Sequence, residues 1–124
     1  MTEISRIYSN IDTLKDVKCP YNEQKNINSI ALHSNNIKVI EPGILQKFCN
    51  LTLLDLSSNQ IEKIQGLEKL YNLKTLNLSN NKVNNNSIFI IYINNNNNNN
   101  NNISYNNDKN NKNNKEYFII LTFI

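Results

Sequence analysis

Residues 51–61 read LTLLDLSSNQI, and residues 27–37 (INSIALHSNNI) and 73–83 (LKTLNLSNNKV) repeat the same arrangement of aliphatic residues around one asparagine. Each segment reads L-x-x-L-x-L-x-x-N-x-L, with isoleucine or valine at some of the leucine positions. The segments recur at intervals of 24 and then 22 residues. Repetition at such intervals predicts a solenoid, in which neighbouring coils bury one another's apolar faces.

The first half of each repeat is predicted to be a β-strand. Leu53–Ser57 has a period of two, in which Leu54 and Leu56 point one way and the other three side chains point the opposite way. This pattern is typical of a strand with one buried face. We expect Ser29–His33, Leu53–Ser57 and Thr75–Ser79 to stack in parallel as a small curved sheet. The aliphatic and aromatic residues of the returning halves should close the core on the convex side: Ile37, Ile40, Leu45, Phe48, Ile61, Ile64, Leu67 and Leu70.

One asparagine occupies the same position in all three repeats: Asn35, Asn59 and Asn81. There the chain turns off the strand, and backbone groups inside the coil lose their partners in the sheet. A buried amide supplies both donors and an acceptor to such groups. We therefore expect a structural asparagine ladder across the coils and no catalytic role for these residues.

Over Ile27–Val83 the chain resembles the leucine-rich-repeat family. The 22-residue unit is similar to the intracellular subclass of protein-phosphatase-1 regulatory subunits, the spliceosomal A-prime protein and axonemal dynein light chains. The 24-residue unit looks like the commoner "typical" subclass. The resemblance implies an α/β solenoid, a short curved array with parallel strands on its concave face. It also implies a non-enzymatic scaffold or adaptor, because family members usually bind protein partners on that face.

The concave face supplies the candidate site. Outward-facing strand positions are predicted to form three columns: Ser29, Leu53 and Thr75; Ala31, Asp55 and Asn77; His33, Ser57 and Ser79. We expect partner contacts at Leu53, Asp55, Asn77, His33, Thr75 and Ser57. The alternative is an ordinary solvated sheet face. Leu53 is the large apolar residue among these positions.

Residues 1–26 are expected to cap the solenoid at its N-terminal end. Ile4, Ile7, Ile11 and Leu14 have helical spacing, which favours one amphipathic helix ending before Pro20. The alternative is a degenerate repeat that uses Leu14, Val17 and Cys19. The domain organisation expected is therefore a cap over 1–26, a solenoid of about three coils over 27–83, and a tail.

The tail, residues 84–124, is rich in asparagine and contains the run Asn94–Asn102. Such low-complexity polar sequence is typical of disorder. Three interpretations are open. Its apolar segments, Ile88–Ile93 and Tyr117–Ile124, could add strands to the exposed sheet edge. The segment could be a disordered tail. It could also be translated AT-rich intron, which would make the chain a truncated or mis-spliced fragment with no independent function.

Composition excludes several other functions. A net charge of +3 is too small to indicate a nucleic-acid partner, although the spliceosomal resemblance raises RNA–protein assembly as a third function. The single histidine and the two distant cysteines form no catalytic or metal-ligating pattern, so no enzyme activity, metal or cofactor is expected. The apolar runs are too short to span a membrane and no secretory signal is recognised. We expect a monomer in the cytoplasm or nucleus.

Overall fold

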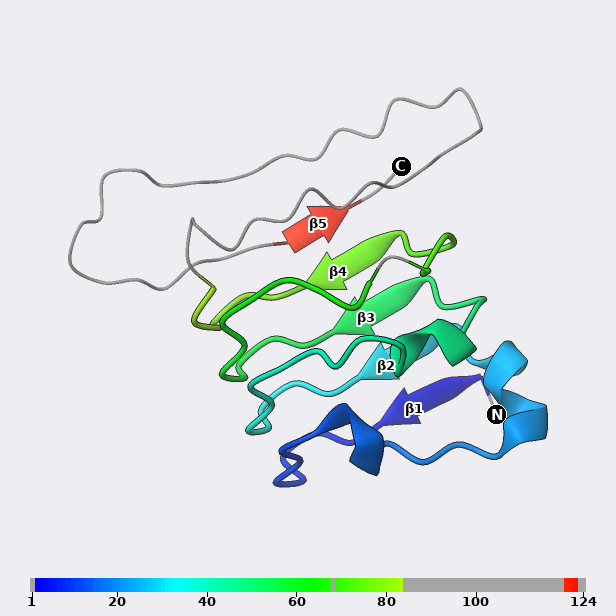
Figure 1. The fold of residues 1–124 in the computed structure, drawn as a ribbon, viewed down its shortest axis with the longest axis horizontal. Coiled ribbons are helices and arrows are strands. Elements are labelled where there is room, and N and C mark those ends of the chain that lie inside the picture. The colour runs from blue at the N-terminus through cyan, green and yellow to red at the C-terminus, as the bar shows by residue number, and fades with distance from the viewer. Residues whose placement is uncertain (1, 68, 84–119, 123–124) are drawn as a thin grey trace.

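The computed structural model describes residues 2–67, 69–83 and 120–122. It contains one sheet in the order β1-β2-β3-β4-β5 (Figure 1). The strands are β1 (Glu3–Ser5), β2 (Ser29–Ala31), β3 (Leu53–Asp55), β4 (Thr75–Asn77) and β5 (Ile120–Thr122). Three 3-10 helices lie between them: η1 (Leu14–Asp16), η2 (Tyr21–Asn26) and η3 (Leu45–Lys47).

The expected parallel stacking of β2, β3 and β4 is confirmed. Ile30 pairs with Leu54, and Leu54 pairs with Leu76, so equivalent repeat positions lie side by side. The strands are shorter than the five residues expected, because the backbone leaves the sheet shortly after the third residue of each strand. The turn residues Ser34, Ser58 and Asn80 have positive φ angles of 61°, 52° and 55°. A left-handed residue at the same repeat position ends each extended segment.

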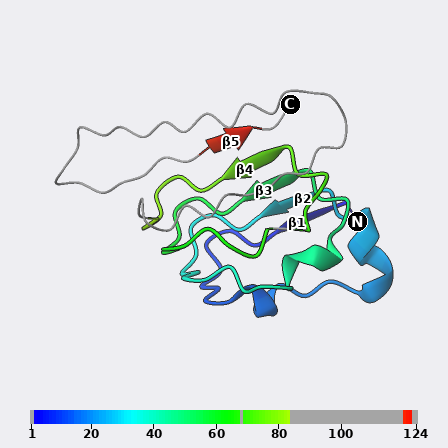
Figure 2. The same cartoon turned by 45° about the horizontal axis from the view of Figure 1, so that its top comes forward.

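The core lies between the sheet and the returning halves of the coils (Figure 2). The inward strand residues Ile30, Leu54 and Leu76 are fully buried. All the residues predicted to close the convex side are buried: Ile37, Ile40, Leu45, Phe48, Ile61, Ile64, Leu67 and Leu70. Stacked coils therefore share one continuous apolar interior, which supplies the main favourable term for folding.

The convex side differs from the α/β expectation. Within the described residues it contains single turns and 3-10 helices and no α-helix. A returning half of a coil this short has room to close the core with one tight turn, as η3 does with Leu45 buried. The array is therefore a solenoid of strands and turns.

The expected amphipathic helix near the N-terminus is wrong. Residues Glu3–Ser5 form β1, which pairs in parallel with β2. Ile7, which a helical stripe would bury with Ile4, is 41% exposed, whereas Ile4 is 2% exposed. Leu14 and Val17 are buried and Cys19 packs against the core, as the degenerate-repeat alternative requires. The exposed edge of β2 explains the result, because a parallel strand satisfies backbone groups that a helix would leave unpaired.

The far end of the sheet carries β5, which pairs with β4 in the antiparallel direction. This pairing fits the interpretation in which an apolar segment of the tail adds a strand to the sheet edge. The expectations for Ile88–Ile93 and Asn94–Asn102 lie outside the described residues. Across the part of the chain that is described, no helix is long and apolar enough to cross a membrane.

Candidate binding surface on the concave face

The strand register confirms that the residues of the first two predicted columns are neighbours across the sheet, and it adds one residue of β1 to each column. Glu3, Ser29, Leu53 and Thr75 are successive partners across β1 to β4. Beside them runs a second column: Ser5, Ala31, Asp55 and Asn77. The sequence argument missed Glu3 and Ser5, because it assigned their segment to a helix. The alternation of polar residues around Ile4 was the signal that could have found them.

Leu53 is the exposed apolar residue of these columns. Its side chain is 39% exposed, although it lies in the middle of the sheet between Ser29 and Thr75. The flanking Ser29 and Thr75 are half-buried. The surface therefore offers one aliphatic contact surrounded by short polar side chains.

Asp55 and Asn77 lie side by side and make the same local hydrogen bonds. The Asp55 Oδ1 atom accepts from the backbone N–H of Ser57 at 2.9 Å and from its hydroxyl at 2.6 Å. The Asn77 Oδ1 atom accepts from Ser79 in the same way, at 3.0 and 2.8 Å. Each side chain thereby fixes the turn after its strand. Both residues fix the turn in the same way. Asp55 differs from Asn77 in its negative charge.

His33 follows the end of β2 and contacts the first coil. Its Nδ1 atom is 3.2 Å from the Ser34 hydroxyl oxygen. The Tyr8 ring packs against it edge to face, with ring centroids 6.0 Å apart and an interplanar angle of 84°. Tyr8 is 77% exposed, and the sequence argument did not select it because it lies in the coil that was expected to be helical.

Behind the concave face, three asparagines are buried where the coils turn: Asn35, Asn59 and Asn81. The Asn59 amide donates to the Leu32 and Leu56 carbonyl oxygens, both at 3.0 Å. Its Oδ1 atom accepts from the Ile37 N–H at 3.1 Å. Every one of these asparagines therefore satisfies backbone groups on two coils.

The ladder repeats at both neighbouring coils. Asn81 donates to the carbonyl oxygens of Leu56 and Leu78, and accepts from the Ile61 N–H. Asn35 donates to Arg6 and Leu32, and accepts from Ser9 and Ile11. The bonds fix the position of each strand end relative to the next, so the ladder holds the concave columns in register.

A second set of asparagine contacts connects the coils at the opposite end of the strands. The Asn50 amide donates to the Lys25 carbonyl oxygen at 2.8 Å, and the Asn72 amide donates to that of Cys49 at 2.9 Å. Sequence reasoning did not find this pair. Their common signal is an asparagine four residues before the central strand residue, Leu54 or Leu76.

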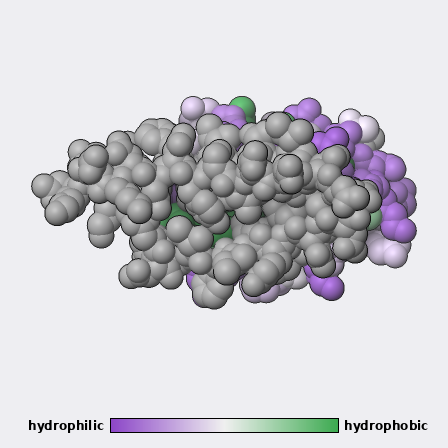
Figure 3. Space-filling view, turned by 90° about the horizontal axis from the view of Figure 1, so that it is seen from above, coloured by the Kyte–Doolittle hydropathy of each residue, from purple (hydrophilic) through white to green (hydrophobic). Residues whose placement is uncertain are grey.

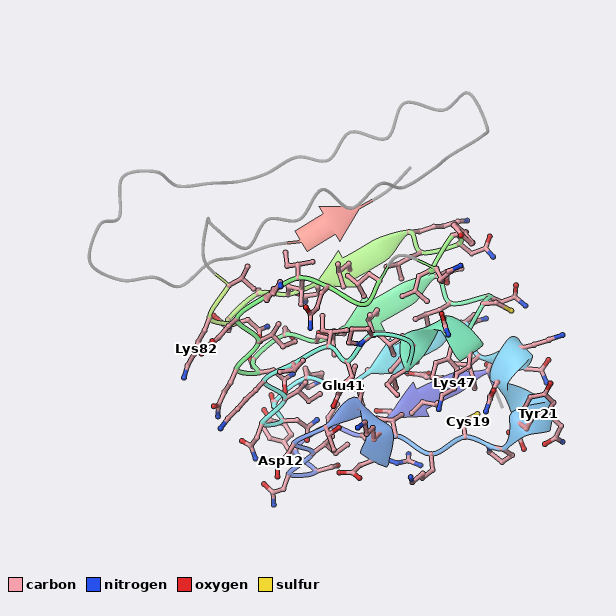
Figure 4. The ribbon with its side chains drawn as sticks, viewed as in Figure 1. Asp12, Cys19, Tyr21, Glu41, Lys47 and Lys82 are labelled. Atoms are coloured by element: carbon pink, nitrogen blue, oxygen red, sulfur yellow. The ribbon has the colours of Figure 1, made fainter. Side chains whose placement is uncertain are left out.

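The described residues hold no group of three or more histidine, cysteine, aspartate or glutamate side chains that could bind a metal ion. Figure 4 shows that the labelled ionic side chains Asp12 and Lys82 lie at one end of the coils, and Cys19 and Tyr21 at the other. Seen from above in Figure 3, the visible described surface is mostly hydrophilic.

Comparison with known proteins gives a family match for the repeats. Residues 25–83 match the leucine-rich-repeat family. A comparison with curated proteins found no match. An internalin from Listeria monocytogenes is similar in structure, with 18% sequence identity and a TM-score of 0.40 over 70% of this chain. The aligned region spans 37% of that internalin.

Proposed function

We propose that this leucine-rich-repeat protein is a protein-interaction scaffold or adaptor whose partner binds the concave face. Leucine-rich repeats generally mediate protein–protein contacts, and residues 25–83 match the family. The observation that carries the proposal is the exposed Leu53 side chain beside the charged Asp55 on one strand. An apolar anchor with a charged neighbour is suited to a protein surface.

The proposed contact surface is centred on β3 and extends to its neighbours. Leu53 supplies apolar area, and Asp55 supplies a carboxylate for a basic or hydrogen-bond-donating group. Thr75, Asn77, Ser57 and His33 supply polar contacts around them. This chemistry suits a protein segment with an aliphatic and a basic side chain, and it disfavours nucleic acid because the central charge is negative. We also propose that the chain acts as a monomer, and that the subclass is that of the intracellular 22-residue repeats.

Matched surface variants test the proposal. The purified chain is used as bait, and bound proteins are identified by quantitative mass spectrometry. Leu53→Ser is compared with Val39→Ser, which alters an aliphatic side chain of similar exposure, 47% against 39%, outside the strands. Asp55→Asn is compared with Glu62→Gln, which removes an exposed charge from a returning loop.

We expect one or more proteins to be lost from both β3 variants and retained by both controls. Loss of an apolar anchor typically weakens binding by about 1–2 kcal/mol, which is roughly a five- to thirtyfold change in affinity. If every captured protein binds the β3 variants as well as the wild type, the concave face is not the binding surface. If the control variants lose the same proteins, the site lies on another face.

A further inference from the structure

The outer edge of β4 differs from the edge that faces β3. The Thr75 N–H donates to the Thr52 carbonyl oxygen at 3.0 Å, and the Asn77 carbonyl oxygen accepts from the Leu56 N–H at 2.9 Å. These bonds use the side of β4 that faces β3. Backbone groups alternate along a strand, so the N–H and C=O of Leu76 face the opposite edge. An edge of this kind is a template for another strand.

The strand on that edge does not belong to the repeat. β1 to β4 are parallel, and each is one coil after its neighbour. β5 runs antiparallel and pairs Leu121 with Leu76. Because the Leu76 groups face outward, these two residues form the hydrogen-bonded type of antiparallel pair, which exchanges both N–H···O bonds.

The asparagine ladder ends at the same place. The Leu56 carbonyl oxygen accepts from Asn59 of its own coil and from Asn81 of the next. The Leu78 carbonyl oxygen accepts from Asn81, and within the described residues no asparagine of a following coil reaches it. In the part of the chain that the structure describes, the asparagine ladder therefore ends at β4. The backbone N–H and C=O groups on the outer edge of β4 can still form hydrogen bonds, and an extended segment is the structure that pairs with such an edge.

Ile120–Thr122 occupies the outer edge of β4. We propose that this edge is a strand-binding site and that the segment serves there as the protective end strand of the sheet. The bound segment satisfies the Leu76 backbone groups and blocks pairing of this edge with a strand from another molecule. The proposal does not depend on the concave-face function, because the backbone edge and the sheet face are separate surfaces.

Two proline variants of the full chain test the pairing. Leu121→Pro removes an N–H that points at β4, so it breaks the bond to Leu76. Thr122→Pro is the matched control, because the N–H of Thr122 points away from β4 and proline is tolerated at such edge positions. Amide hydrogen exchange is measured by NMR at Leu76. Leu56 serves as the internal reference, since its N–H is bonded to Asn77.

We expect the Leu76 amide to exchange about tenfold faster in Leu121→Pro than in the wild type. Its exchange should be unchanged in Thr122→Pro, and that of Leu56 unchanged throughout. A wild-type Leu76 amide that exchanges as fast as in Leu121→Pro would overturn the proposal, as would equal effects of the two prolines. Wild-type protection that requires high protein concentration, with a dimer in sedimentation, would assign the strand to a second copy and overturn intramolecular pairing.

Discussion

The Asn59 side-chain amide donates a hydrogen bond of 3.0 Å to the carbonyl oxygen of Leu32, which lies 27 residues earlier in the preceding coil. The same amide also bonds to the Leu56 carbonyl in its own coil. One buried side chain thus replaces the ladder partners that two strands lose when they turn. Hydrophobic burial alone would not fix the coils in register, because it is non-directional.

Asn59→Asp should therefore be strongly destabilising although it preserves the shape of the side chain. The carboxylate keeps the acceptor for the Ile37 N–H but removes the donors to Leu32 and Leu56. We expect the free energy of unfolding to fall by at least about 2 kcal/mol, because the Leu32 and Leu56 carbonyl oxygens each lose one of two asparagine donors and a charge is buried. Urea unfolding followed by circular dichroism measures it. The exposed control Asn22→Asp should stay near the wild-type midpoint, and equal midpoints for both variants would contradict the structural role.

Gly66 is a second position where the coils approach closely. A Cβ atom there would lie 3.0 Å from both the Ile40 Cγ2 and carbonyl oxygen atoms, and φ is +73°. Gly43 has a similar φ of +84°, but its nearest neighbour would be a flexible Gln46 atom at 3.7 Å. Both alanine variants carry the cost of a left-handed residue, about 1 kcal/mol.

Gly66→Ala should lose about 1–3 kcal/mol more than Gly43→Ala, because Ile40 would have to move to accept the methyl group. The melting temperatures of the two variants are measured by calorimetry under identical conditions. Equal melting temperatures would show that the contact between Gly66 and Ile40 is relaxed without cost.

Asp55 has a structural task and a proposed binding task, and two substitutions separate them. Asp55→Asn retains an Oδ1 acceptor for the Ser57 N–H and hydroxyl, as Asn77 does for Ser79. Its free energy of unfolding should match that of the wild type within about 0.5 kcal/mol. Asp55→Ala removes both bonds and should cost about 1–2 kcal/mol. Chemical denaturation measures both, and an Asn variant as unstable as the Ala variant would show that the charge itself stabilises the fold.

Glu41 connects the first two coils on their convex side, where Figure 4 shows it beside the first coil. It accepts hydrogen bonds from the Thr13 hydroxyl and from the Leu14 N–H, the latter at 3.3 Å. Glu41→Ala should accelerate hydrogen exchange at the Leu14 amide several-fold, because that N–H loses its partner. Exposed Glu62→Ala is the control. Unchanged exchange at Leu14 would show that the hydrogen bond to Glu41 does not protect that amide.

Residues with a local, repeated pattern were predictable. The periodicity around Leu54 and its equivalents determines which residues face the core, and the recurrent Asn59 position identifies a buried polar group. The first coil was mispredicted because Arg6 and Ser9 stand where the other coils have leucine and asparagine. The isoleucines there also have helical spacing, and local spacing cannot show that the edge of β2 provides a better partner.

The sequence alone therefore determined the strands, the buried face and the ladder positions of residues 27–83, because adjacent coils repeat the same short-range pattern. The tertiary structure decided that Glu3–Ser5 joins the sheet and that Ile120–Thr122 closes it in the antiparallel direction. It also decided which carbonyl each asparagine reaches and how far Leu53 is exposed. These features depend on unpaired backbone groups and neighbours that are distant in sequence, so they exist only once the coils have stacked.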